Sequence, residues 1–329
     1  MPVRGCLRRS VTVPPDAMRG WLVRLMFDAH GVRAVVRAVL FIVLVGVMAL
    51  LVTLMIRGIV ESVPLWYRRL QAIVHQGRTG AIPVSLIALN ESVFLVSALF
   101  ATWVMSWLEG RPMSDIGFKR PNRWRDLTGG FLVGFGMLSV LVGALVALGF
   151  ARLQAPTVGH GTALGYALAW LAAMLLVGCF EESAFRGYLL TVLRERYGFW
   201  PAALAVTVLF MAAHGLNVGE NPTGLATVAV VSVLFCLAIR RTGALWWVIG
   251  CHAAWDWAES YFFGSADSGE RSVGHLLTLR PLGNIYLSGG RDGPEGSVLC
   301  LAVLFLAIAA LPLLIRHRGT AAAPAVAEA

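Results

Sequence analysis

The chain has 329 residues, of which 58% are hydrophobic and only 14% are charged, and its mean hydropathy is +0.74. About a quarter of the residues in a soluble domain are charged, so this composition excludes a water-soluble globule; it also excludes a disordered chain and a disulfide-rich secreted scaffold. The formal net charge is +9, but the basic residues stand between apolar runs and near the chain ends, which argues against nucleic-acid binding.

Apolar runs of about 20 residues, the length that crosses a bilayer as a helix, recur along the chain. We count eight predicted spans, at approximately 34–56, 82–108, 127–151, 162–180 with a continuation, 200–216, 223–240, 243–263 and 297–316. The predicted fold is therefore an all-α, polytopic integral membrane protein with about eight transmembrane helices. This helical bundle occupies 34–316, after a basic segment at 1–33 and before an Ala-rich tail at 317–329 that we expect to be disordered.

The distribution of arginine and lysine predicts the orientation, because these residues resist translocation across the membrane. With the N-terminus inside, the inner segments hold most of the basic residues near the span ends, and the outer loops hold fewer. We therefore expect both termini to be cytoplasmic, and the basic segment 1–33 to lie on that side.

Ionisable side chains within apolar spans are costly and mark functional sites by default. Three such places lie in the second half of the chain, and together they hold Glu181, Glu182, Arg186, His214, His252 and Asp256. A fourth place is Asn90-Glu91 in the second predicted span. We expect that pair to serve a helix contact or an access path and leave it out of the catalytic set.

Helical spacing limits which of these groups can meet. His252 and Asp256 are four residues apart, so they lie on one helix face and can address one ligand or each other. Glu182 and Arg186 have the same spacing, which predicts an ion pair within the helix. Glu181 projects about 100° away from Glu182, so we expect the two glutamates to have different roles.

The helical rise predicts that the polar groups reach a similar depth. A helix from Glu181 to Phe199 descends about 27 Å, and the next helix climbs about 21 Å from Trp200 to His214. A further hairpin through 223–240 brings His252 to the same side of the bundle. One carboxylate, two imidazoles and the carboxylate of Asp256 are therefore predicted to converge inside the membrane.

Two chemical interpretations of this set remain open, and both predict hydrolysis. In the first, Glu181, His214, His252 and Asp256 bind Zn²⁺ with an open position for a water, which the metal turns into a nucleophile. In the second, which needs no metal, Glu181 acts as general base towards a water and the histidines donate hydrogen bonds to the developing oxyanion.

The motif residues resemble a known family. Glu181-Glu182-x-x-x-Arg186, Phe210-x-x-x-His214 and His252-x-x-x-Asp256 are similar, in order and spacing, to the three signature motifs of the CPBP family, which comprises the CAAX prenyl protease and bacteriocin-processing intramembrane peptidases. The resemblance covers approximately 162–263, about a third of the chain. It adds an independent reason to expect peptide-bond hydrolysis within the membrane.

The resemblance implies a role for each motif residue. Glu181 would activate the attacking water together with His214, while Glu182 and Arg186 would support the site. His252 and the residue at position 256 would bind the scissile carbonyl or complete a metal site. That position is commonly Asn in the family and is Asp256 here, and an ionised Asp cannot donate a hydrogen bond. This departure favours a metal-ligand role for Asp256 or a role in orienting His252.

The predicted function is that of an intramembrane endopeptidase of the CPBP or CAAX protease type, of either the metallo or the glutamate class. The expected partners of the protein are the lipid bilayer and a peptide or membrane-protein substrate, lipidated or not. The expected cofactor is Zn²⁺ or none. The expected location is the inner (plasma) membrane of a bacterium. Two alternatives remain. One is a non-catalytic scaffold or immunity factor on the same fold. The other is a proton-coupled transporter, which is disfavoured because the candidate groups cluster in the second half of the chain rather than in symmetric halves.

Overall fold

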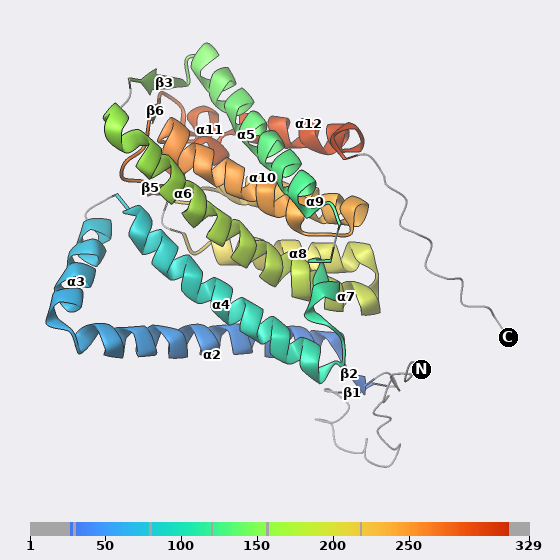
Figure 1. Cartoon of the computed structure of the whole chain (residues 1–329). Helices are drawn as coiled ribbons and strands as arrows, with labels where there is room; N and C mark the ends of the chain where they lie inside the picture. Colours follow the sequence, from blue (N-terminus) through green and yellow to red (C-terminus); the bar gives the residue numbers. More distant parts are fainter. Residues whose placement is uncertain are drawn as a thin grey trace.

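The computed structural model describes residues 27–28, 31–78, 81–119, 121–155, 158–217 and 219–315. The predicted basic segment 1–33, apart from 27–28 and 31–33, and the predicted tail 317–329 lie outside the described residues. Most of the described chain is helical (Figure 1). The α-helices are α2 Ala34–Glu61, α3 Pro64–Arg78, α4 Val84–Leu108, α5 Arg123–Ala147, α6 His160–Glu181, α7 Leu190–Tyr197, α8 Phe199–His214, α9 Pro222–Thr242, α10 Trp246–Trp257, α11 Ile285–Ser288 and α12 Val298–Leu314.

Four shorter helical segments interrupt or join these helices. η2 Met113–Ile116 and η5 Pro294–Gly296 are 3₁₀ turns. η3 Glu182–Leu189 and η4 Ala258–Phe263 are π-helical, and they continue α6 and α10 respectively. π-Helical turns are rare in proteins as a whole, and those that do occur are often found at functional sites. In this chain, one of them begins within the first motif and the other begins two residues after Asp256.

The helices are those of an integral membrane protein, as the composition predicts. Five are long and apolar enough to cross a membrane: α2, α4, α5, α9 and the continuous helix Gly161–Tyr197 that contains most of α6 with η3 and α7. The predicted spans 200–216, 243–263 and 297–316 correspond to the shorter α8, α10 with η4, and α12. The all-α membrane fold is thus confirmed, and the count of eight spans stays a prediction.

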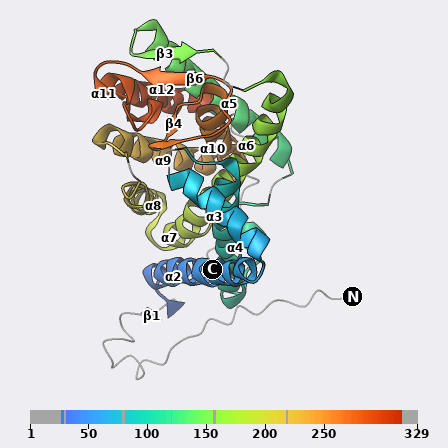
Figure 2. The same ribbon diagram turned by 90° about the vertical axis from the view of Figure 1, so that its left-hand side faces the viewer.

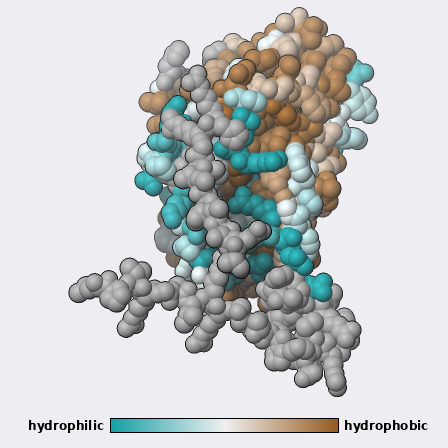
Figure 3. Space-filling view, turned by 90° about the vertical axis from the view of Figure 1, so that its right-hand side faces the viewer, coloured by the Kyte–Doolittle hydropathy of each residue, from teal (hydrophilic) through white to brown (hydrophobic). Residues whose placement is uncertain are grey.

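The two ends of the bundle differ in character. α2 begins and α12 ends at the same end, on the right of Figure 1. Exposed basic residues lie at this end, in a connection (Lys119) or within a turn of a helix terminus (Arg123, Arg194 and Arg240). Figure 3 views this end and shows hydrophilic residues beside a broad hydrophobic flank. The first and last helices therefore have the relative placement that the predicted topology requires, whereas the cytoplasmic orientation of this end stays a prediction.

The opposite end carries the longer connections (Figure 2). Here β3 Ala151–Gln154 pairs with β6 Thr278–Pro281, and β4 Ala266–Asp267 pairs with β5 Glu270–Arg271, both antiparallel. An isolated bridge joins Ile82 to Ser272. The connection between α10 and α12 is therefore tied both to the loop after α5 and to the start of α4. The helix α3 also lies at this end, between the predicted spans 34–56 and 82–108.

Close packing of α5 against α10 depends on three glycines. A Cβ atom at Gly130 or Gly134 would overlap the backbone carbonyl of Trp247 or Cys251, and one at Gly250 would overlap the carbonyl of Leu127. Small residues spaced in this way let two membrane helices approach at backbone distance. This contact sets the position of α10, which carries His252 and Asp256.

Candidate active site

A cavity of about 500 Å³ lies within the bundle and collects the predicted polar groups. Its lining includes Glu181 at the end of α6, His214 at the end of α8, and both His252 and Asp256 on α10. These residues come from three separate motifs, and the structure brings them to one place, as the helical rise predicted. Glu182 and Arg186 do not line the cavity; they are buried behind it.

The ion pair predicted between Glu182 and Arg186 is present and fully buried. Arg186 Nη1 lies 3.1 Å from Glu182 Oε1, and both side chains have an exposed fraction of 0%. The guanidinium also lies over the ring of Phe210, with 3.9 Å between Cζ and the ring centroid, and the rings of Phe185 and Phe235 are within 6 Å. The aromatic rings and the carboxylate together compensate a charge that would otherwise be costly to bury.

The imidazole of His252 lies between the two adjacent glutamates. Its Nδ1 is 2.9 Å from Glu182 Oε1, whereas its Nε2 is 3.6 Å from Glu181 Oε2 and 3.5 Å from Asp256 Oδ2. A carboxylate only accepts hydrogen bonds, so Nδ1 carries a hydrogen and donates a hydrogen bond to Glu182. Glu182 therefore orients the ring from behind, and Glu181 faces the side of the ring that points to the cavity.

His214 is held by the residue one helical turn before it. Its Nδ1 lies 3.0 Å from the carbonyl oxygen of Phe210, and the two ring centroids are 4.3 Å apart. A carbonyl oxygen can only accept, so Nδ1 donates; the neutral tautomer compatible with this contact has its lone pair on Nε2. Phe210 thus serves both motifs, because its backbone sets the tautomer of His214 and its ring covers Arg186.

The lining of the cavity extends beyond the predicted catalytic residues. Asn90 and Glu91, which we expected to serve a helix contact or an access path, also line the cavity, and Asn90 Nδ2 donates to Glu91 Oε1 at 3.1 Å. The lining further includes Asp267, Glu270 and Glu295 from the connection between α10 and α12. Charged residues are ordinary in loops, so their presence in the sequence carried no signal.

The loop carboxylates lie in a strongly acidic environment. Burial, followed by repulsion from Asp256 and Glu295, raises the pKa of Asp267 well above its usual value. Burial also raises the pKa of Glu270. At this end of the cavity, burial therefore disfavours the ionised forms of the carboxyl groups that the connection between α10 and α12 contributes.

A second acidic pair lies at the start of α9. Burial, together with repulsion from Asp292, raises the pKa of Glu220 to about 8. Burial and repulsion from Glu295 raise the pKa of Asp292 to about 7. The acidic environment therefore extends from the cavity to the N-terminus of α9.

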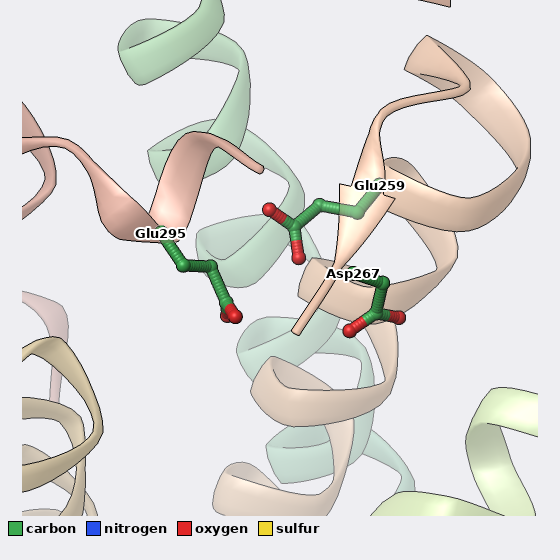
Figure 4. Close-up of side chains that lie close together, drawn as sticks. All are labelled: Glu259, Asp267 and Glu295. Atoms are coloured by element: carbon green, nitrogen blue, oxygen red, sulfur yellow. The ribbon is translucent and has the colours of Figure 1, made fainter. Parts of the chain in front are cut away.

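The four predicted zinc ligands are not gathered as a metal site requires. In the described part of the chain, one group of three side chains has ligand atoms that all lie within 4.8 Å of one another, and it consists of Glu259, Asp267 and Glu295 (Figure 4). Glu181, His214, His252 and Asp256 do not form such a group, so this geometry supports no reaction step through a metal held by them. Zinc binding by these four residues stays the alternative to the metal-free interpretation, which is the one that we propose.

Glu259 is a residue that sequence reasoning could have found. It is an ionisable residue inside the predicted span 243–263, three positions after Asp256, and it was not singled out. In the structure it lies in η4 with an exposed fraction of 0%. The signal was the one used for the other motif residues, a charge inside an apolar run.

Comparison with known proteins supports the motif-based resemblance. Residues 163–258 match the family model described as type II CAAX prenyl endopeptidase Rce1-like. The matched range contains all six predicted site residues and nearly coincides with the expected CPBP-like core at 162–263. No curated protein and no solved structure matches the chain. The segment that carries all six predicted site residues is thus similar to type II CAAX prenyl endopeptidases of the Rce1-like kind, and it is part of an integral membrane protein.

Proposed function

We propose that this protein is an intramembrane endopeptidase of the CAAX protease type, which hydrolyses a peptide bond with a water activated by Glu181 and His214. The observation that carries the proposal is the meeting of Glu181, His214, His252 and Asp256, from three motifs of the Rce1-like segment, at one cavity in the bundle. The family implies a peptidase, and the roles proposed for the individual residues are those that the motif resemblance implies.

The attacking water is held by two acceptors. Glu181 Oε2 is a buried atom with no hydrogen-bond partner among the described residues, and His214 keeps an unprotonated Nε2. A water between them can donate one hydrogen to each. Glu181 takes the proton as the water oxygen attacks the carbonyl carbon, and returns it to the amide nitrogen as the carbon–nitrogen bond breaks.

His252 stabilises the charge that develops on the carbonyl oxygen. Its Nδ1 is anchored on Glu182, so Nε2 is directed to the cavity side, between Glu181 and Asp256. As an imidazolium it donates from Nε2 to the oxyanion. Asp256 favours this charged form of the ring, which gives a carboxylate a function at a position where related proteins commonly have Asn.

The substrate class follows from the family and from the cavity. The lining of the cavity combines apolar side chains, including Ile87, Met137 and Trp170, with the polar catalytic groups. We propose a peptide with a prenylated cysteine near its C-terminus, since the apolar part of the cavity can receive the lipid while the peptide reaches Glu181.

The test is cleavage of a quenched fluorescent farnesylated peptide by the purified full chain in lipid vesicles. We expect wild-type protein to cleave it and Glu181→Gln to lose at least 100-fold in kcat, the lower bound for loss of a general base. The matched control is Glu61→Gln, an exposed carboxylate on α2 that pairs only with Arg57 among the described residues. Cleavage by Glu181→Gln at the wild-type rate would refute the proposed role.

The alternatives predict other outcomes in the same preparation. Folded wild-type protein that cleaves neither the farnesylated nor the unmodified peptide contradicts the proposal and favours a scaffold. Proton-linked uptake into the vesicles that disappears with Glu181→Gln, in the absence of cleavage, favours a transporter.

A further inference from the structure

Glu259 is a buried carboxylate without a visible counter-charge. Its exposed fraction is 0%, and neither Oε1 nor Oε2 has a hydrogen-bond partner among the described residues. No Arg, Lys or His of the described ranges forms an ion pair with it. An ionised carboxylate in such a place is strongly destabilising unless a positive charge is supplied.

Two further carboxylates face Glu259. Ligand atoms of Glu259, Asp267 and Glu295 all lie within 4.8 Å of one another. The three come from different elements, namely η4, β4 and η5, and Figure 4 shows their carboxylates directed toward a common space. Where the chain is described, neither Asp267 nor Glu295 has an ion-pair partner.

Neighbouring donors fix the two loop carboxylates in this arrangement. Trp255 Nε1 donates to Glu295 Oε1 at 2.8 Å, and Ser268 Oγ donates to Glu295 Oε2 at 3.1 Å. Ser260 Oγ donates to Asp267 Oδ2 at 3.0 Å. Each oxygen keeps further acceptor capacity. The site is therefore preorganised on two sides, and the unpartnered carboxylate of Glu259 completes it.

We propose that Glu259, Asp267 and Glu295 bind a hard divalent cation, with Ca²⁺ as the best match. Ligands that are all carboxylate oxygens suit Ca²⁺ and Mg²⁺, whereas Zn²⁺ prefers nitrogen and sulfur. Ca²⁺ accepts irregular geometry and bidentate carboxylates, whereas Mg²⁺ demands a near-ideal octahedron. This site is separate from the motif residues Glu181, His214 and His252.

The position of the site suggests what the cation does. Asp267 and Glu295 belong to the connection between α10 and α12, and Glu259 continues the helix that carries His252. Asp267 and Glu295 also line the catalytic cavity. The cation joins the connection to this helix and neutralises negative charge beside Asp256, so it stabilises the wall of the cavity without taking part in the reaction.

The test uses Tb³⁺, a luminescent substitute for Ca²⁺, on the purified full chain in detergent. The indole of Trp255, which contacts Glu295 directly, is placed to sensitise the luminescence. We expect a saturable signal that Ca²⁺ displaces at lower concentration than Mg²⁺. Glu259→Gln should lose at least 10-fold in affinity for Tb³⁺. Asp267→Asn is a second variant with the same expected loss, in case Glu259→Gln does not fold.

Two control variants separate this inference from the proposed function. Glu270→Gln changes a carboxylate of the same connection that lines the cavity but lies outside the group, and it should bind Tb³⁺ as wild type does. Glu181→Gln should abolish cleavage and leave Tb³⁺ binding unchanged. The inference is overturned if wild-type protein gives no saturable signal, if Zn²⁺ displaces Tb³⁺ far better than Ca²⁺, or if folded Glu259→Gln binds as tightly as wild type.

Discussion

Replacing Glu182 by leucine should destabilise the protein by leaving Arg186 without its carboxylate. Both side chains are completely buried, and Arg186 Nε and Nη2 already lack hydrogen-bond partners among the described residues. After the substitution, the compensation that remains for the guanidinium is its contact with aromatic rings, chiefly that of Phe210. Such a cation–π contact is worth about 2 kcal/mol when desolvated, less than the energy of an uncompensated buried charge.

The expected loss of stability follows from the complete burial of the Glu182–Arg186 ion pair. Removing one partner of a buried ion pair costs about 3–5 kcal/mol. At roughly 2–3 °C per kcal/mol for a chain of this size, the apparent Tm falls by about 6–15 °C. The double substitution Glu182→Leu with Arg186→Met removes both charges and keeps apolar volume, so it should recover at least half of the loss. Both the single and the double variant should lack cleavage activity, because His252 Nδ1 no longer has its acceptor on Glu182.

Thermal unfolding in detergent, followed with a thiol-reactive dye, measures this effect. Cys236, Cys251 and Cys300 are free and buried, so they react when the bundle opens. The reasoning is refuted if Glu182→Leu melts at the wild-type temperature. It is also refuted if the double substitution is as unstable as the single one, since the loss would then come from packing and not from the unpaired charge.

Three further predictions concern other parts of the molecule. Gly134→Ala should lower the apparent Tm by several degrees, because its Cβ would overlap the backbone of Cys251, whereas Gly136→Ala on the same helix has open space around its Cβ and should not; equal melting temperatures would contradict the close α5–α10 contact. The raised pKa of Glu220, about 8, means that the folded state binds its proton more tightly than the unfolded state does, so stability is lost as pH rises from about 4.5 to 8. Glu220→Gln should therefore be more stable than wild type at pH 9, by on the order of 1 kcal/mol after allowance for solvent screening of a half-buried group, and nearly equal at pH 5, as measured by melting curves at both pH values. Cleavage should persist in a chelator that removes zinc but not calcium, and mass spectrometry of the purified protein should find zinc far below one ion per chain; stoichiometric zinc that is lost with His252→Ala would instead support a metallopeptidase.

The features that depend on local helical spacing could be predicted from the amino-acid sequence alone. Long apolar runs require helices in a bilayer, because backbone polar groups must be satisfied within the segment. Residues four apart share a helix face, which predicted both the Glu182–Arg186 ion pair and the approach of His252 to Asp256. The constant rise per residue was enough to predict that His214 reaches the depth of Glu181.

The contacts that join segments distant in the chain could not be predicted in this way, because they depend on the tertiary packing. Asn90 and Glu91 reach the cavity because α4 packs against α6, and Glu295 meets Glu259 because the connection after α10 folds back over the bundle. The π-helical turns that carry Glu182 and Glu259 also have no periodic signal in the sequence. Spacing along one helix defines its faces, but the neighbour of each face is chosen by packing and loop conformation, which depend on the whole chain.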